Sequence, residues 1–149
     1  MTELVKVFIN SECVMPDEIE KYRLRLPVER MHDAIFYSSL LIGESATMAS
    51  EAAVLGVPAI YVDDKGTSNT DDEAKAGLIF YYKPSEKIKV IEKAMEILNS
   101  TDNEIIKVKR NNYFKEKIDV TAFFVWLIER WPKSKYEIRN TAEFWGRFK

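Results

Sequence analysis

A small group of polar residues and one glycine stands between two apolar runs near the middle of the chain. Leu40–Ile42 is a short apolar run, Gly43 ends it, and Ser45 and Thr47 follow. Glycine permits a ligand to approach the backbone closely, and hydroxyl side chains both donate and accept hydrogen bonds. Glu51 comes four residues after Thr47, which is about one helical turn. These residue types at this spacing favour the binding of a phosphate-like anion beside a hydrogen-bond-accepting carboxylate.

The elements that must position these residues follow from the apolar pattern around them. Leu40–Ile42 predicts a buried strand, and Ser45 is a typical N-cap for the alanine-rich helix that follows. Gly56 is expected to end that helix, and Pro58–Val62 predicts a second strand. Two buried strands joined by a helix make a right-handed βαβ unit, which implies a parallel sheet. The helix then directs free N–H groups and its positive dipole end at the turn.

The role of Glu51 is open at this level. A capping-box carboxylate would stand three residues after Ser45, and that position is Met48. Glu51 is therefore either a solvated surface glutamate or an acceptor for the ribose hydroxyls of a nucleotide whose phosphates lie on the turn.

The stretch Ile42–Ile60, with the sequence IGESATMASEAAVLGVPAI, resembles the nucleotide-binding signature in the carboxyl-terminal domain of GT-B glycosyltransferases. UDP-N-acetylglucosamine 2-epimerases share that architecture. The closest likeness is to an uncharacterised prokaryotic family in the same superfamily, whose members carry a similar S-x-T-M-x-x-E-A-A-x-L-G-x-P-A-I run. A weaker resemblance extends from about Val5 to Asn99.

The resemblance implies a role for each residue of this turn. Ser45, Ala46 and Thr47 would contact the diphosphate of a UDP-sugar, next to Gly43, and Glu51 would contact the ribose. The epimerases tend to carry glycines just after the serine, and Ala46 and Thr47 depart from that pattern. Side chains at these two positions change how closely a phosphate can approach the backbone. The N-terminus of the helix is still expected at the turn.

The pattern as a whole predicts a three-layer, Rossmann-like α/β domain over residues 1–100, with a parallel sheet of four to five strands. Val5–Ile9 is apolar enough for a first, central strand, and Leu78–Tyr82 predicts a further strand. Pro27–Tyr37 predicts a helix before the central unit. Ile88, Ile91, Met95 and Leu98 recur at helical spacing after Ser85, which suits an N-cap, and this face is expected to pack in the core.

Several other residues are candidates for contacts with the sugar or phosphate. Glu12 follows the expected first strand, and Lys65 and Thr67 follow the expected Pro58–Val62 strand, so all three should lie at the carboxyl edge of the sheet. Ordinary solvated loops explain them equally well. His32, the single histidine, is either a hydrogen-bonded residue on a helix flank or a ligand contact, and the resembled family also has a histidine ahead of the central strand. Cys13 is expected to be a small buried hydrophobe.

Composition excludes several classes of protein. No apolar run approaches the roughly 20 residues that span a bilayer, and no signal peptide is evident at the amino terminus, so a cytoplasmic location is expected. A single cysteine and a single histidine exclude an internal disulfide and predict no metal site and no cofactor. Residues 1–100 hold 11 basic and 17 acidic side chains, and residues 101–149 hold 11 and 7. The basic residues of that tail are interleaved with acids, so nucleic-acid binding is not expected.

Residues 101–149 predict a helical extension rich in aromatics, with Asp119 as the cap of a helix over Val120–Arg130. These aromatics need a cover, either on the sheet or on a partner chain or second copy. The resemblance implies a donor-binding half that binds a UDP-sugar. It would act as a glycosyltransferase or sugar epimerase only when a second domain or subunit completes it, and no catalytic residue is assigned. The alternative is a non-catalytic α/β module that docks a partner or self-associates through the aromatic helices. A response-regulator-like module is a weaker alternative, because only one acid, Glu12, follows the expected first strand.

Overall fold

A computed structural model describes residues 5–65, 68–100, 104–139 and 141–149 of the chain. The chain divides into two compact units, Met1–Ala34 and Ile35–Lys149.

The first unit contains a short helix, α1 (Asp17–Glu20), and a 3₁₀ turn, η1 (Val28–Arg30). The turn leads directly into α2 (Met31–Phe36), which confirms the helical segment expected after Pro27. The strand expected at Val5–Ile9 is not formed. Only Ile9 pairs, in an isolated parallel bridge with Arg23. A strand requires neighbouring backbone along its length, and this bridge supplies one position, so Val7 and Phe8 remain more than half exposed.

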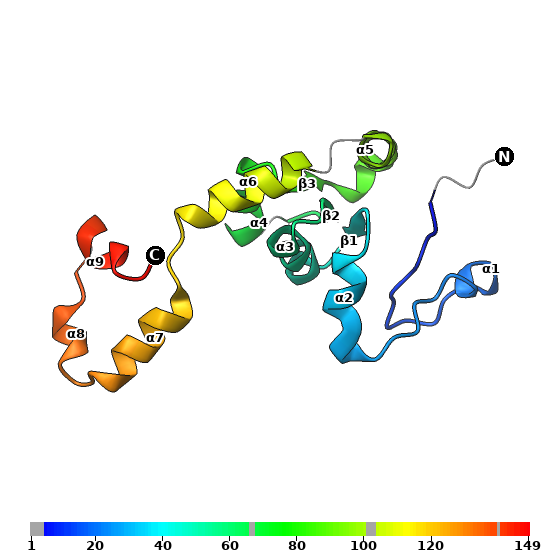
Figure 1. Ribbon diagram of the computed structural model, residues 1–149. Coiled ribbons are helices and arrows are strands. Elements are labelled where there is room, and N and C mark those ends of the chain that lie inside the picture. Colours follow the sequence, from blue (N-terminus) through cyan, green and yellow to red (C-terminus); the bar gives the residue numbers. More distant parts are fainter. Residues whose placement is uncertain (1–4, 66–67, 101–103, 140) are drawn as a thin grey trace. The chain divides into compact units, whose positions relative to one another are not determined.

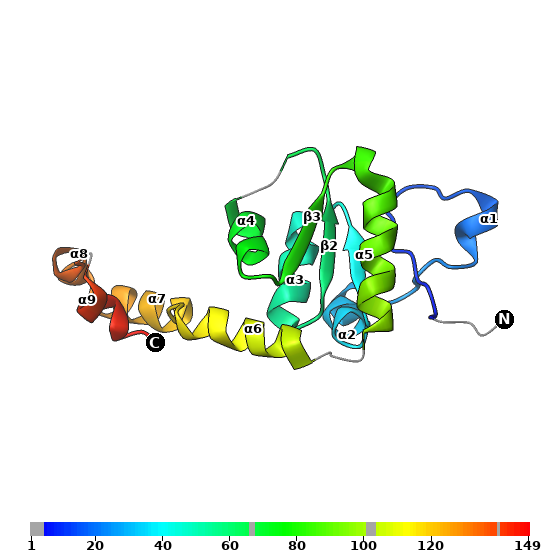
Figure 2. The same ribbon diagram turned by 90° about the horizontal axis from the view of Figure 1, so that it is seen from above.

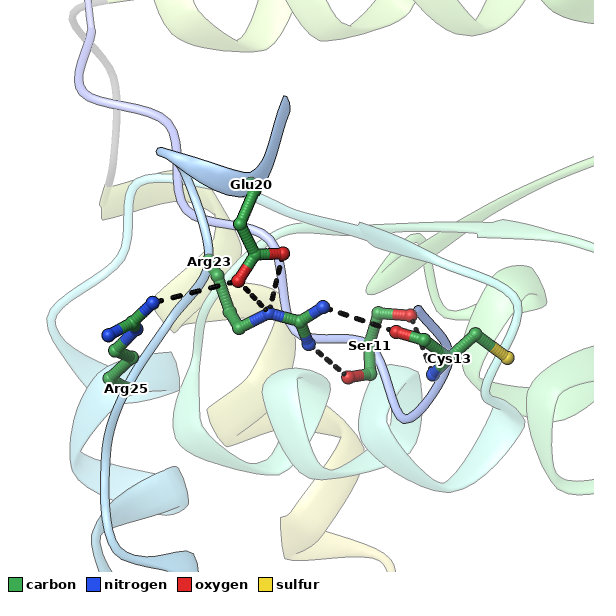
Figure 3. Close-up of polar contacts among 5 residues, drawn as sticks. All are labelled: Ser11, Cys13, Glu20, Arg23 and Arg25. Carbon is green, nitrogen blue, oxygen red and sulfur yellow. Dashed lines mark hydrogen bonds and ion pairs between the residues drawn. The ribbon is translucent and has the colours of Figure 1, made fainter. Parts of the chain in front are cut away.

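Arg23 organises the loop around this bridge (Figure 3). Its Nε donates to both carboxylate oxygens of Glu20, at 2.7 and 2.9 Å. Its terminal nitrogens donate to the carbonyl oxygens of Ser11 and Cys13, at 2.9 and 3.2 Å. Arg25 adds a longer ion pair to Glu20 at 3.6 Å. The Cys13 side chain is exposed, so its expected burial was wrong.

The second unit is built on a parallel sheet of three strands, β1 (Leu41–Gly43), β2 (Ala59–Val62) and β3 (Ile79–Tyr82). The strands lie side by side in the order β1-β2-β3 (Figure 2). The α/β class and the parallel sheet are therefore confirmed. Within the described residues the sheet has three strands rather than the expected four to five, because the Val5–Ile9 segment forms no strand.

Helices flank this sheet on both sides, with α3 (Ala46–Leu55) and α5 (Lys87–Asn99) on opposite faces (Figure 1). Helix α3 contributes Ala49, Ala52 and Ala53, all almost fully buried. Their small side chains allow a close approach of the helix to the strands. Helix α4 (Ser68–Lys75) follows β2 and lies beside β3. The core of this unit consists of β2 and β3 residues with the alanine face of α3.

Helix α5 differs from expectation in two respects. It is entered through a second 3₁₀ turn, η2 (Pro84–Glu86), in which Glu86 accepts a hydrogen bond from the Lys83 backbone at 3.0 Å, so Ser85 is not the cap. The face expected in the core is largely exposed. Ile88 and Ile91 are 74% and 63% exposed, and the buried residue is Ala94.

The remaining chain is helical, with α6 (Glu104–Lys115), α7 (Val120–Glu129), α8 (Ser134–Glu137) and α9 (Ala142–Gly146). Asp119 caps α7 as expected, since its Oδ1 accepts from the Ala122 backbone at 2.9 Å. The aromatic side chains of α7 pack against those of the α9 segment rather than against the sheet. No helix among the described residues is long and apolar enough to cross a membrane.

Candidate functional site

The turn between β1 and α3 has the geometry that the sequence predicts. Ser45 is the N-cap, and its Oγ accepts a hydrogen bond from the Met48 backbone at 3.3 Å. Gly56 ends the helix in the left-handed conformation, with φ of 81°. With its 10 residues, α3 is long enough for its aligned peptide dipoles to act together. The amides of Ala46 and Thr47 belong to the first turn, where helix geometry provides no intrahelical acceptor.

Gly43 leaves the approach to this turn open. A Cβ built on Gly43 would meet no other atom within 4 Å, and the backbone there is not in the left-handed region. The fold itself therefore does not require glycine at this position. The side chains of Ser45 and Thr47 are exposed, whereas Ala46 is half-buried. The open backbone beside two exposed hydroxyls is suited to an anionic group that approaches the main chain.

Glu51 lies on α3 and is half-buried. It is four residues beyond Thr47, so the two side chains lie on the same side of the helix, separated by about 6 Å along its axis. Glu51 already has an interaction within the chain. This placement brings the predicted phosphate and ribose contacts onto one helix, one turn apart.

A second polar group lies at the carboxyl end of the neighbouring strand. Tyr61 is 1% exposed, and its hydroxyl donates to Asp63 Oδ2 at 2.9 Å. The Lys65 backbone donates to the other carboxylate oxygen at 3.1 Å, and the Tyr81 hydroxyl donates to the Asp63 carbonyl at 2.9 Å. We call Tyr61, Asp63 and Tyr81 the tyrosine–aspartate cluster.

These contacts set the ionisation of the cluster. The Lys65 backbone amide, followed by the Tyr61 hydroxyl, holds the pKa of Asp63 below its ordinary value. Burial, followed by the hydrogen bond to Asp63, raises the pKa of Tyr61. Burial also raises the pKa of Tyr81, with the Asp63 charge as the next cause. At neutral pH the cluster therefore consists of one carboxylate and two protonated phenols, which is an arrangement that fixes the loop after β2.

Strand register brings this cluster to the same edge of the sheet as the Gly43 turn. Gly43 is paired with Tyr61, and Tyr61 with Tyr81. All three strands run in the same direction, so the segments after their carboxyl ends leave from one edge. Ligands of open parallel sheets bind at that edge. The sequence alone does not predict the cluster, because the contact between Tyr61 and Tyr81 depends on the register of β2 and β3.

The other candidate residues are only partly gathered at this site. Lys65 has an exposed side chain in the loop after β2, and its backbone amide donates a hydrogen bond to the Asp63 carboxylate. Thr67 lies outside the described residues. Glu12 and His32 are exposed residues of the separate unit Met1–Ala34, so the site consists of second-unit residues alone. No group of three His, Cys, Asp or Glu side chains in the described part of the chain is placed to hold a metal ion.

One pocket of about 440 Å³ lies away from the predicted residues, between α3, α4 and α6. Ser50 and Glu73 lie in its wall, where the Ser50 hydroxyl donates to Glu73 Oε2 at 2.6 Å. Glu73 is buried. The pocket is also lined by Tyr113 and Phe114 at the end of α6, by Lys117 and Ile118 in the loop after it, and by Val120 at the start of α7. The hydroxyl therefore satisfies the buried carboxylate in a link between α3 and α4.

Comparison with known proteins adds no relative to this description. No protein-family model, curated protein or solved structure matches the chain.

Proposed function

We propose that the turn Gly43–Thr47 binds the diphosphate of a UDP-type nucleotide sugar, and that the chain is the donor-binding half of a GT-B glycosyltransferase or epimerase-like protein. The observation that supports this most directly is the capped N-terminus of α3, whose cap Ser45 stands two residues after the carboxyl end of a parallel strand. The resemblance of Ile42–Ile60 to the GT-B signature supplies the identity of the ligand.

In this proposal the diphosphate is bound by the positive end of the α3 dipole and by backbone amides of the turn. A helix N-terminus carries roughly half a positive charge, and the Ala46 and Thr47 amides provide two donors for phosphate oxygens. Ser45 Oγ already accepts from the Met48 amide, but its hydroxyl hydrogen remains available as a donor. Gly43 allows the phosphate to approach the strand end, because no side chain fills that space.

Glu51 holds the ribose in this proposal. A ribose is joined directly to the diphosphate, and Glu51 follows Thr47 by one helical turn, or about 6 Å. A carboxylate accepts hydrogen bonds from both ribose hydroxyls. The same spacing would not place Glu51 on the phosphates, where its negative charge would be unfavourable.

The chain supplies one wall of a catalytic site in this scheme. The described turn offers an anion site and acceptors, with no nucleophile paired to a base. A second domain or subunit would contribute the acceptor site and catalytic base, and the donor half would position the sugar against them.

Isothermal titration with UDP, UDP-N-acetylglucosamine, ADP and GDP tests the proposal. Selective binding of the uridine nucleotides is expected. Equal binding of all four, or of none, would contradict a UDP-sugar donor site.

Glu51→Ala tests the ribose contact. The loss of a hydrogen bond to a charged group costs about 1.5–3 kcal/mol, so UDP should bind at least about tenfold more weakly. Affinity for 2′-deoxy-UDP should fall less, because one of the two hydroxyls is absent. Glu92→Ala on the exposed face of α5 is the matched control. Because Glu51 has a partner in the chain, the unfolding free energy of each variant is measured alongside. Equal weakening of both nucleotides would exclude the ribose role.

A further inference from the structure

Helix α7 has one face that is covered within its own segment. Five rings from α7 and the α9 segment contact one another, with centroid separations of 5.0 to 6.1 Å. These rings, the aromatic cluster, are those of Phe123, Trp126, Phe144, Trp145 and Phe148. Phe144 and Phe148 are 5% and 6% exposed. The Asp119 amide also donates to the Phe148 carbonyl at 2.5 Å, which fixes the chain end to the start of α7.

The opposite face of α7 carries mainly apolar side chains and is largely exposed, although Val120 at its start also lines the pocket beside α6. Val120, Phe124 and Ile128 follow one another at four-residue intervals and are 53%, 52% and 72% exposed. Residues at four-residue spacing share one side of a helix. Val125, at the border of this side, is 49% exposed, and Trp131, in the turn just after the helix ends at Glu129, is 61% exposed. We call these five residues the outer face of α7.

Basic and aromatic side chains border this face on the segment that follows. Tyr136 is 67% exposed, and Lys135 Nζ lies 4.7 Å from its ring centroid and 5.8 Å from that of Trp131. Lys133 is exposed on the same turn. Helix α8 is fixed to α7, because fully buried Ser134 donates to the Leu127 carbonyl at 2.7 Å. The apolar and basic side chains are thus presented from one connected scaffold.

The size of the outer face argues against a second copy as its cover. About half of each of five side chains is exposed, and a large side chain offers about 150–250 Å², so the face supplies roughly 500 Å². A stable dimer needs about 800 Å² per partner. Residues 101–149 also carry 11 basic against 7 acidic side chains, so two copies brought together here would repel.

An anionic lipid surface matches the same features. Tryptophan and tyrosine are favoured at the boundary between lipid headgroups and acyl chains. An apolar helix face inserts a short way into that boundary, while nearby lysines attract acidic headgroups. Docking on an anionic lipid surface requires no complementary protein interface. The excess of basic over acidic side chains in residues 101–149 attracts the acidic headgroups.

We propose that the outer face of α7, with Lys133, Lys135 and Tyr136 beside it, docks the protein on membranes that contain anionic lipids. The helix lies along the surface with Phe124 and Ile128 in the headgroup layer. The aromatic cluster on the other side remains packed. This is independent of nucleotide binding, because no residue of the Gly43 turn takes part.

Vesicle co-sedimentation of the full chain tests the proposal. Binding to phosphatidylcholine vesicles that contain phosphatidylserine is expected, with much weaker binding to phosphatidylcholine alone. Ile128→Ser should weaken binding about tenfold or more, and Ile91→Ser on α5, which alters a similarly exposed isoleucine, should leave it unchanged. Replacement of both Lys133 and Lys135 by Gln should weaken it about tenfold, and only on the acidic vesicles.

Three outcomes would overturn the proposal. The first is that the chain binds neither the acidic nor the neutral vesicles. The second is that Ile91→Ser and Ile128→Ser lose binding equally. Sedimentation equilibrium supplies the third: a concentration-dependent dimer that Ile128→Ser disperses would assign the outer face to a second copy. Circular dichroism of each variant shows that the helices are retained.

Discussion

Gly43→Ala separates ligand binding from folding at the proposed nucleotide site. A Cβ at this position meets nothing within 4 Å, and the backbone conformation is one that alanine adopts. The variant should therefore be as stable as the parent, or more stable by about 0.4–1 kcal/mol, because alanine restricts the unfolded chain.

The same methyl group should impair the binding of a diphosphate. It occupies the open approach to the backbone that the proposal assigns to phosphate. Loss of one hydrogen bond to a charged oxygen costs about 1.5–3 kcal/mol, which corresponds to about a 10- to 150-fold weaker Kd. Titration with UDP measures this change, and urea denaturation measures stability on the same samples.

Gly146→Ala is a matched control, because a Cβ there also meets nothing within 4 Å. It lies in α9, away from the sheet, and should bind UDP as the parent does. If Gly43→Ala binds UDP with parental affinity while the parent is uridine-selective, the phosphate does not approach Gly43. If Gly43→Ala is instead destabilised, the reasoning from open space at the strand end is refuted.

Three further predictions concern the scaffold. Gly56→Ala should lower the unfolding free energy by about 1–2 kcal/mol, because φ at this position is 81° and the new Cβ lies 3.3 Å from Arg110 Cδ. Urea denaturation measures this change, with Gly146→Ala as the control. Asp119→Ala should cost about 1 kcal/mol by the same measurement, since it removes the α7 cap. The pKa of Asp63 is lowered on folding from 3.8, so its contribution to stability is complete above that pH and disappears as pH falls through the lower, folded-state pKa. The stability difference between the parent and Asp63→Asn should thus be constant above about pH 4 and shrink below it, and a constant difference down to pH 2 would refute this assignment.

Local sequence signals were sufficient to predict the βαβ unit. Ser45 and Gly56 act on backbone groups within a few residues of themselves, so their roles as caps follow from sequence alone. The same holds for Asp119 at the start of α7. The candidate phosphate turn was therefore predictable, since it is defined by the end of a strand and the start of a helix.

Features that depend on distant neighbours were less predictable. Val5–Ile9 has the composition of a strand, but a strand also needs a partner along its length, and Ile9 alone has one. Ile88 and Ile91 have core-like spacing, yet both are exposed, because the spacing does not specify which elements pack against the helix. The contact of Tyr61 and Tyr81 required the register of β2 and β3, which no local pattern specifies.

The shortness of β1 limits how many ladder bonds a further strand could form at its outer edge. Among the described residues, β1 has three residues and pairs with β2 alone, and the Leu41 amide donates inward to the Pro58 carbonyl at 3.0 Å. Backbone groups alternate in direction along a strand, so Gly43 also faces β2 and Ile42 alone presents its N–H and C=O outward. A strand of ordinary length, about five to six residues, would gain ladder bonds at one residue of this edge. Edge-to-edge aggregation through β1 is therefore disfavoured by its shortness, without a charged or proline residue in the strand to block it.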